Sequence, residues 1–191
     1  MVYLQYIACN GNIELIIDVL SYSCPGNVYE KEQREVMDFL REQLKNRQAG
    51  RVLDIATGEG EFLAEVLEKV GSFDEAVGID LNEQRMGDAR NRNKDARVSF
   101  QAGDALALTF EDDSFDTVSV RNSLHHVDEP SRLLSELHRV LKPGGTAVIM
   151  ECVRDSSTME QRLYVEMHHW WGEINRAQGI KHNATYWRDE L

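Results

Sequence analysis

The sequence predicts an α/β fold, a mostly parallel sheet with helices on both faces, and three observations lead to it. Between residues 51 and 152, apolar runs of strand length alternate with segments of helical periodicity, which is the pattern of strands joined by crossover helices. Several runs are almost continuously apolar, as expected where both faces of a sheet are covered. The composition, 42% hydrophobic and 28% charged, is typical of a globular domain. The five predicted strands span residues 51–55, 75–80, 97–101, 115–120 and 146–152.

Two crossover helices are predicted from apolar residues that recur at intervals of three and four. The first lies between the first two strands, and Gly71 follows its last apolar residue as a C-terminal glycine. The second begins at Pro130, a residue favoured in the first turn of a helix, and ends before Pro143. The apolar stripes are Leu63, Val66, Leu67 and Val70 in the first helix, and Leu133, Leu134, Leu137, Val140 and Leu141 in the second.

Helices are also predicted on both sides of this core. Residues 28–48 show helical spacing among many charges, which favours a structural helix over a lid that closes on a site. Residues 156–178 carry another apolar stripe, which we expect to be buried in the core. This stripe consists of Met159, Leu163, Met167, Trp170, Trp171 and Ile174. We expect one domain with three parts: an N-terminal helical segment and candidate lid (1–50), the α/β core (51–152), and a C-terminal helical segment (153–191).

Charge and cysteine content limit the classes of function. The chain has 33 acidic and 21 basic side chains and a net charge of −12, which disfavours binding to nucleic acid phosphates. It has no run of about 18 apolar residues that could span a membrane. The three cysteines are few and widely spaced, so neither a disulfide framework nor a zinc cluster is indicated, and a reducing cytoplasm is the expected location.

A glycine-rich turn follows the first predicted strand. The segment VLDIATGEGEF, residues 52–62, runs from a hydrophobic strand through Asp54, Gly58 and Gly60 into a helix. In an open α/β sheet, ligands bind in the crevice at the carboxyl ends of the strands, and glycines let the main chain approach a ligand closely. The turn therefore predicts a binding site, in which Asp54 either contacts the ligand or only fixes the turn.

Two more carboxylates follow the next two strands. Asp80 stands about twenty residues after the last glycine, where an acidic side chain accepts hydrogen bonds from ribose hydroxyls. Asp104 is placed to accept one from an adenine amine, or to cap the following loop instead. An acidic edge favours a cationic sulfonium ligand over a dinucleotide with its pyrophosphate, and Leu63 occupies the third glycine position of the dinucleotide motif. The residues thus favour S-adenosylmethionine over NAD.

Five motifs, in their order and spacing, resemble the class I S-adenosylmethionine-dependent methyltransferases, particularly the small-molecule branch that includes ubiquinone and menaquinone biosynthesis enzymes. They span residues 52–152, about half of the chain. The resemblance implies a Rossmann-like fold, S-adenosylmethionine as cofactor, S-adenosylhomocysteine as product, and a small-molecule methyl acceptor. The motifs are VLDIATGEG, VGIDL, QAGDAL, FDTVSVRNSLHHV and RVLKPGGTAVI.

The resemblance also implies roles for individual residues. The turn after the first strand would hold the methionine part of the cofactor, the end of the second strand the ribose, and the end of the third the adenine. The end of the fourth strand would border the sulfonium and the acceptor. In that order the residues are Asp54, Ala56, Thr57, Gly58 and Gly60; Asp80 and Leu81; Gly103, Asp104 and Ala105; and Arg121 and Asn122. Ala56 departs from the family's pattern, in which glycine is common.

His125 and His126, in the loop after the fourth strand, are the candidate catalytic residues. Methyl transfer mainly requires alignment of acceptor, methyl group and sulfur, and a base helps only where the acceptor loses a proton. A histidine can supply that base; alternatively, the pair only shapes the pocket. His168 and His169 are neighbours on a predicted helix and point in different directions, so we expect no metal site.

Two other functions are compatible with these features: a nicotinamide-dependent oxidoreductase on a related fold, and a non-catalytic module that keeps the fold and binds a partner. The resembling enzymes usually complete a seven-stranded sheet with an antiparallel pair after the last helix, whereas this chain stops at Leu191. We therefore expect that pair to be absent from a truncated or reduced chain. The open edge of the fifth strand would then favour a homodimer.

Overall fold

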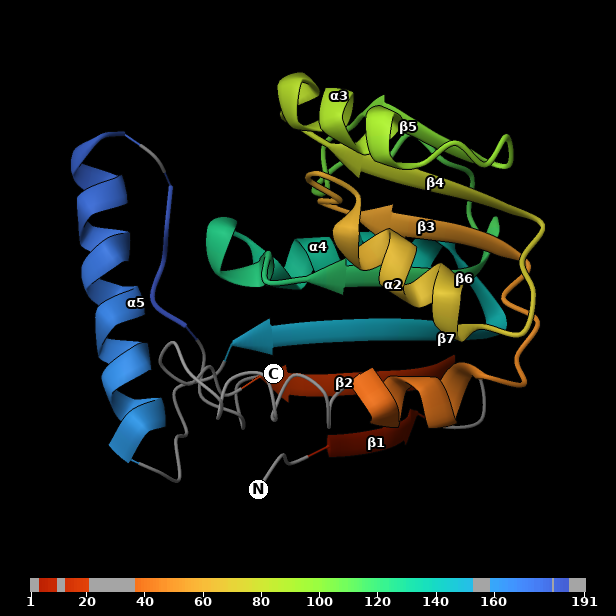
Figure 1. The fold of residues 1–191 in the computed structure, drawn as a ribbon, viewed down its shortest axis with the longest axis horizontal. Coiled ribbons are helices and arrows are strands. Elements are labelled where there is room, and N and C mark those ends of the chain that lie inside the picture. Colours follow the sequence, from red (N-terminus) through yellow and green to blue (C-terminus); the bar gives the residue numbers. More distant parts are fainter. Residues whose placement is uncertain (1–3, 10–12, 21–36, 153–158, 180, 186–191) are drawn as a thin grey trace.

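The computed structural model describes residues 4–9, 13–20, 37–152, 159–179 and 181–185. Its centre is a seven-stranded sheet with the strand order β1-β2-β7-β6-β3-β4-β5 (Figure 1). Neighbouring strands are parallel except β1, which pairs antiparallel with β2. The strands are β1 (Leu4–Cys9), β2 (Ile13–Leu20), β3 (Arg51–Ile55), β4 (Glu75–Asp80), β5 (Val98–Ala102), β6 (Phe115–Arg121) and β7 (Leu141–Cys152).

The five strands predicted for the core are all present, which confirms the Rossmann-like α/β fold class. β3 and β4 have the predicted bounds, while β5 and β6 differ by one residue at their ends. β7 starts earlier than predicted because Leu141, directly after the preceding helix, already pairs with Phe115 of β6. The apolar run of β3 is buried, as a central strand requires.

The N-terminal segment corrects the prediction, because residues 4–9 and 13–20 form two strands and not a helix. β2 pairs with β7 in parallel, from Ile13 opposite Gly145 to Leu20 opposite Cys152. The outer pair of the sheet thus comes from the N-terminal part of the chain and not from residues after the last helix. The expectation that β7 has an open edge is wrong, and the argument for a homodimer that rested on that edge no longer applies. The run IELIIDVL is almost continuously apolar and rich in isoleucine, which is itself a strand signal.

Helices cover both faces of the sheet (Figure 1). Alternate residues of β7 face two separate cores, so that Val148 and Met150 pack with α2 and the helix at 37–44, whereas Ala147 and Ile149 pack on the side of α4. None of the helices in the described ranges is both long and apolar enough to cross a membrane. The helices are α2 (Glu61–Lys69), α3 (Glu83–Arg92), the short 3-10 helix η1 (Leu124–His126), α4 (Pro130–Val140) and α5 (Met159–Ala177), with a further helix at residues 37–44.

α5 confirms the predicted C-terminal helix over residues 159–177, and residues 156–158 lie outside the described residues. The helix predicted for 28–48 is confirmed over 37–44; residues 28–36 lie outside the described residues, and residues 45–48 are not helical. α5 covers neither face of the sheet but stands beyond the carboxyl ends of the strands (Figure 1). The expectation that its apolar stripe belongs to the core is wrong for Met167, Trp170 and Trp171, which are 54, 64 and 57% exposed. Helical spacing identified the stripe, but not what it faces.

Candidate functional site

A cavity of about 780 Å³ opens at the carboxyl ends of β3, β4, β5 and β6. This volume lies within the range of small-molecule and cofactor sites. Of the predicted site residues, all but Gly60 and His125 line it. Those that do are Asp54, Ala56, Thr57, Gly58, Asp80, Leu81, Gly103, Asp104, Ala105, Arg121, Asn122 and His126. The parallel sheet brings these residues together because each lies at or shortly after the carboxyl end of a strand.

The turn after β3 is held in an unusual backbone conformation. Ala56 and Gly58 both have a φ of 55°, in the left-handed region that glycine adopts most readily. The Thr57 amide donates to the carbonyl of Ile79 in β4 at 2.8 Å, which ties the turn to the neighbouring strand. Gly60 serves packing, since a Cβ there would lie 3.0 Å from the Phe100 ring. The turn thus presents its backbone to the cavity, while Gly60 lies behind it.

Asp54 is a buried carboxylate at the base of the cavity. Its side chain is 1% exposed, and its Oδ1 accepts a hydrogen bond from the Ser119 hydroxyl at 2.6 Å. Its Oδ2 is buried without a hydrogen-bond partner among the described residues. Burial raises the pKa of Asp54 to about 6, and the Ser119 hydrogen bond and the charge of Arg121 offset only part of this rise. The ionised carboxylate is therefore only partly compensated, at a position where a ligand cation could add a further partner.

Asp80, at the end of β4, braces the glycine turn. Its Oδ2 accepts from the Gly58 amide and its Oδ1 from the Asn82 amide, both at 2.8 Å. A carboxylate oxygen can accept more than one hydrogen bond, so each retains capacity for a ligand hydroxyl. Next to it, Leu81 is 76% exposed and lines the cavity, which leaves an apolar surface available to a ligand ring.

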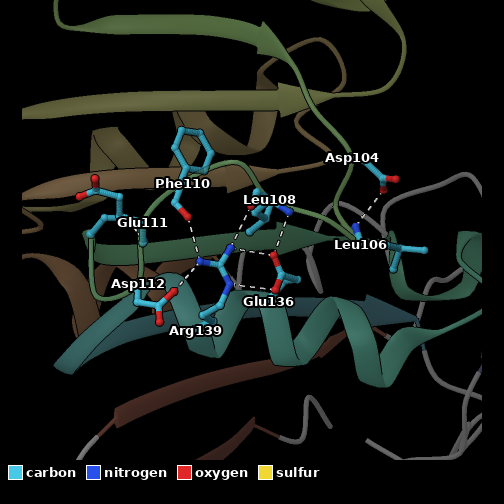
Figure 2. A network of polar contacts seen from close by, with 9 residues as sticks. Asp104, Leu106, Leu108, Phe110, Glu111, Asp112, Glu136 and Arg139 are labelled. Carbon is cyan, nitrogen blue, oxygen red and sulfur yellow. Dashed lines mark hydrogen bonds and ion pairs between the residues drawn. The ribbon is translucent and has the colours of Figure 1, made fainter.

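Asp104 fixes the start of the loop after β5. Its Oδ1 accepts from the Leu106 amide at 2.8 Å, as Figure 2 shows. This is the loop-capping alternative considered for Asp104, and it does not exclude ligand contact, because Asp104 also lines the cavity. A carboxylate capped in this way has a defined position at the rim of the site.

The rest of this loop is anchored to α4 by Arg139 (Figure 2). The guanidinium donates to the carbonyls of Phe110 at 2.8 Å and Leu108 at 2.9 Å, and it pairs with Glu136 at 2.8 Å. Glu136 in turn accepts from the Leu108 amide at 2.8 Å. Hydrogen bonds and the charge of Arg139 lower the pKa of Glu136. The network holds the loop, and with it one wall of the cavity, in a fixed place.

Arg121 and Asn122 form the wall at the end of β6. Arg121 donates to Glu65 at 2.9 Å, and its guanidinium lies 5.0 Å from the centre of the Phe62 ring. Asn122 has a φ of 47°, and its amide donates to the carbonyl of Met150 in β7 at 2.8 Å. The chain is thereby turned sharply from β6 into η1.

The two candidate catalytic histidines face different surroundings. His126 lines the cavity, and its Nδ1 lies 3.1 Å from the carbonyl of Lys181. Burial and the neighbouring His125 lower the pKa of His126. His125 is fully buried outside the cavity lining, and its Nδ1 lies 2.6 Å from Oε1 of Glu151. Only His126 is therefore positioned to meet a molecule in the cavity.

Some lining residues were missed by the sequence analysis. Arg85 of α3 places its guanidinium over Gly58, where an added Cβ would lie 2.8 Å from Nη2. Lys181 comes from the segment after α5 and pairs with Asp128. The sequence did offer a signal for Arg85, because it is a basic residue in the first turn of the helix that follows β4. No local pattern indicates that residues 181–185 return to the end of β6.

Comparison with known proteins identifies the family of this chain. The family model described as "Methyltransferase domain" matches residues 53–149, which is just over half of the chain. The chain belongs to this methyltransferase family. Its motifs and its sheet thus confirm the resemblance to class I methyltransferases, and they go against the oxidoreductase alternative.

Individual family members show how far the similarity extends. The ubiquinone/menaquinone biosynthesis C-methyltransferase of Geobacter sulfurreducens is 35% identical over 121 residues, which are 61% of this chain and 47% of that protein. The chain spans about half the length of the curated relatives it matches. The structure of the YcgJ protein from Bacillus subtilis superposes with a TM-score of 0.63 at 23% identity, covering 82% of this chain and 64% of that one. An S-adenosylmethionine-dependent methyltransferase from Mesorhizobium loti has a TM-score of 0.52 at 29% identity, covering 59% and 51%.

Proposed function

We propose that this methyltransferase domain binds S-adenosylmethionine in the cavity and transfers its methyl group to a small molecule. The observation that carries the proposal is the acidic carboxyl edge of the sheet, where Asp54, Asp80 and Asp104 all line one cavity. Such an edge is complementary to a ligand with a cationic sulfonium and an ammonium group. The names of the relatives and of the structure from Mesorhizobium loti support the same cofactor and reaction.

The residues present fit this cofactor. The buried, unpartnered Oδ2 of Asp54 among the described residues provides a site for a cationic part of the ligand. The turn from Ala56 to Gly58 lines the cavity and provides backbone groups for the methionine portion. Asp80 has acceptor capacity for the ribose hydroxyls, Asp104 for the adenine amine, and Leu81 an apolar surface for the adenine ring.

When bound, S-adenosylmethionine supplies an electrophilic methyl group and leaves as S-adenosylhomocysteine. The protein's task is to hold and align the reactants and to exclude water. Where the acceptor loses a proton, His126 takes it: the Lys181 carbonyl accepts from Nδ1, which leaves Nε2 as the basic nitrogen. An activated carbon acceptor, as the name C-methyltransferase of the relatives indicates for them, needs a weaker base or none. The low cysteine content supports a reducing, cytoplasmic location.

The test is calorimetric titration of the purified chain with S-adenosylmethionine and, separately, with NADH. We expect saturable binding of S-adenosylmethionine and none of NADH. Asp80→Asn keeps one acceptor oxygen for the turn but removes the charge, and we expect it to weaken binding by about 10- to 100-fold. Asp88→Asn is the control, because Asp88 is exposed on α3 outside the cavity lining.

Folding is checked for each variant by circular dichroism. Failure of the folded wild-type chain to bind S-adenosylmethionine contradicts the proposal. Binding of NADH instead would support the alternative function, a nicotinamide-dependent oxidoreductase. Binding without release of S-adenosylhomocysteine across a panel of small-molecule acceptors favours the non-catalytic module.

A further inference from the structure

Histidines from three separate segments converge beside the cavity. His125 lies in η1 after β6, His168 in α5, and His182 in the segment that follows α5. Their ring centres are 5.1 Å apart for His125 and His168, 5.1 Å for His125 and His182, and 4.6 Å for His168 and His182. Among the described residues, one ligand nitrogen from each of the three falls within 4.8 Å of the others. His125 and His182 are buried and His168 is half-buried.

Glu151 fixes the tautomer of His125. Glu151 accepts from Nδ1 of His125 at 2.6 Å, and the side chains are 2 and 1% exposed. The other Glu151 oxygen accepts from the Leu124 amide at 2.9 Å, so the carboxylate is itself fixed. With the proton on Nδ1, the lone pair is on Nε2. A carboxylate that holds the distal N–H of a histidine is the usual partner of a metal-bound imidazole, because it sets the tautomer and raises the basicity of the ligating nitrogen.

His168 and His182 direct the same ring atom at each other. Their Nε2 atoms are 3.0 Å apart. Two nitrogens that bind one tetrahedral zinc ion at 2.0–2.1 Å lie roughly 3.3 Å apart, so these atoms need little movement to share an ion. Nδ1 of His182 lies 3.4 Å from the Asn175 side-chain amide, which in its flipped orientation presents an oxygen to accept from Nδ1–H. Nε2 of His182 is then free of its proton.

Neighbouring residues hold His182 against α5. A Cβ on Gly172, in the middle of this helix, would lie 2.5 Å from Cδ2 of His182. Glycine is unfavourable inside a helix, and here it provides the space for the imidazole. The Asn183 amide donates to the His125 carbonyl at 2.7 Å, and its side chain donates to the Val127 carbonyl at 2.8 Å. The segment that carries His182 is thereby fixed to the turn that carries His125.

The charge of the cluster also suits a divalent cation. Glu151 is buried beside His125 and adds a carboxylate to three imidazoles, whose neutral form is the one that binds a metal.

We propose that His125, His168 and His182 bind one divalent transition metal ion, with zinc the best match, and that Glu151 positions His125 through its Nδ1–H. Three imidazoles leave a fourth position for water, a ligand set that zinc accepts. This revises the expectation of no metal site, which considered only the adjacent His168 and His169; the remaining ligands come from other elements. His126 packs on both His125 and His182, at 4.2 and 4.8 Å between ring centres, so the ion would fix the cavity wall that His126 forms.

The test is metal binding by the untagged full chain, which needs neither cofactor nor turnover and is therefore independent of the proposed methyl transfer. After removal of metal with a chelator, we expect Zn²⁺ to bind at one ion per chain and to raise the unfolding temperature. We expect Co²⁺ to give the intense visible absorption of a tetrahedral site. X-ray absorption should show nitrogen or oxygen neighbours at about 2.0–2.1 Å from zinc.

Three variants and one control decide the assignment. We expect His168→Ala and His182→Ala to lose stoichiometric zinc, and Glu151→Gln to weaken zinc binding by about 10- to 100-fold as a positioning residue. His138→Ala is the control, since His138 is exposed on α4 away from the cluster. A folded, metal-free wild-type chain that neither binds zinc nor gains stability from it overturns the proposal. So does a His168→Ala variant that binds zinc like the wild type.

Discussion

Replacing Asp54 by asparagine tests whether the buried carboxylate lowers the unfolding free energy of the chain at neutral pH. The pKa of Asp54 is about 6 in the folded chain, against 3.8 for an unperturbed aspartate. Because the folded pKa is the higher one, the associated stability is present below the unfolded pKa and is lost as the pH rises through the folded pKa. This rise in pKa corresponds to roughly 3 kcal/mol of unfolding free energy, about half of which is lost between about pH 5 and about pH 7.5.

The measurement is urea unfolding of wild type and Asp54→Asn at both pH values without ligand. Other carboxylates titrate in both proteins, so the informative quantity is the difference between the two unfolding free energies. We expect this difference to shift in favour of Asp54→Asn by roughly 1–2 kcal/mol as the pH rises. Asparagine can still accept from the Ser119 hydroxyl, so the one hydrogen bond described for Oδ1 is retained. A difference that does not change with pH would refute the reasoning.

The same carboxylate should make cofactor binding depend on pH. If the cationic ligand binds the ionised form, wild-type affinity for S-adenosylmethionine should fall about tenfold between about pH 7.5 and about pH 5, because only about a tenth of Asp54 is then ionised. Asp54→Asn should bind more weakly and lose this pH dependence. Calorimetry at the two pH values separates the outcomes, and an unchanged pH dependence in the variant would assign it to another group.

Three further predictions concern the fold around the site. Ala56→Gly should stabilise the chain by roughly 0.5–1 kcal/mol in urea unfolding, because an alanine at a φ of 55° is strained; destabilisation would contradict this. Gly87→Ala should also stabilise it, by up to about 1 kcal/mol, since a Cβ there meets nothing within 4 Å in helix α3. Arg139→Gln should cost about 2 kcal/mol and weaken S-adenosylmethionine binding through the loop it anchors, whereas Arg132→Gln on the same helix should change stability by less than about 0.5 kcal/mol. Equal effects of the two arginine variants would refute the anchoring role.

The core of the fold could be predicted from the sequence because its signals are local. The apolar run of β3 is followed within a few residues by the glycine turn, and Asp80 and Asp104 each come at the end of a strand. Parallel pairing then brings these strand ends together without further information, which is why nearly all the predicted binding residues line one cavity. Residues 13–20 carried an equally local signal, and the error there was to interpret an apolar run next to a charged segment as part of a helical region.

The histidine cluster could not be predicted in this way, because its geometry depends on contacts between distant segments. His168 and His169 diverge on α5 as expected, and His169 instead lies 3.0 Å from the hydroxyl of Thr185. Helical spacing gives no information on the path of residues 181–185. These residues return to the turn after β6, and this return brings His182 to His168. That return depends on Gly172 providing the space, so Gly172→Ala should separate His182 from α5 while leaving the strand-end carboxylates in place. Loss of zinc binding by a folded Gly172→Ala variant would then show that this glycine specifies the metal site.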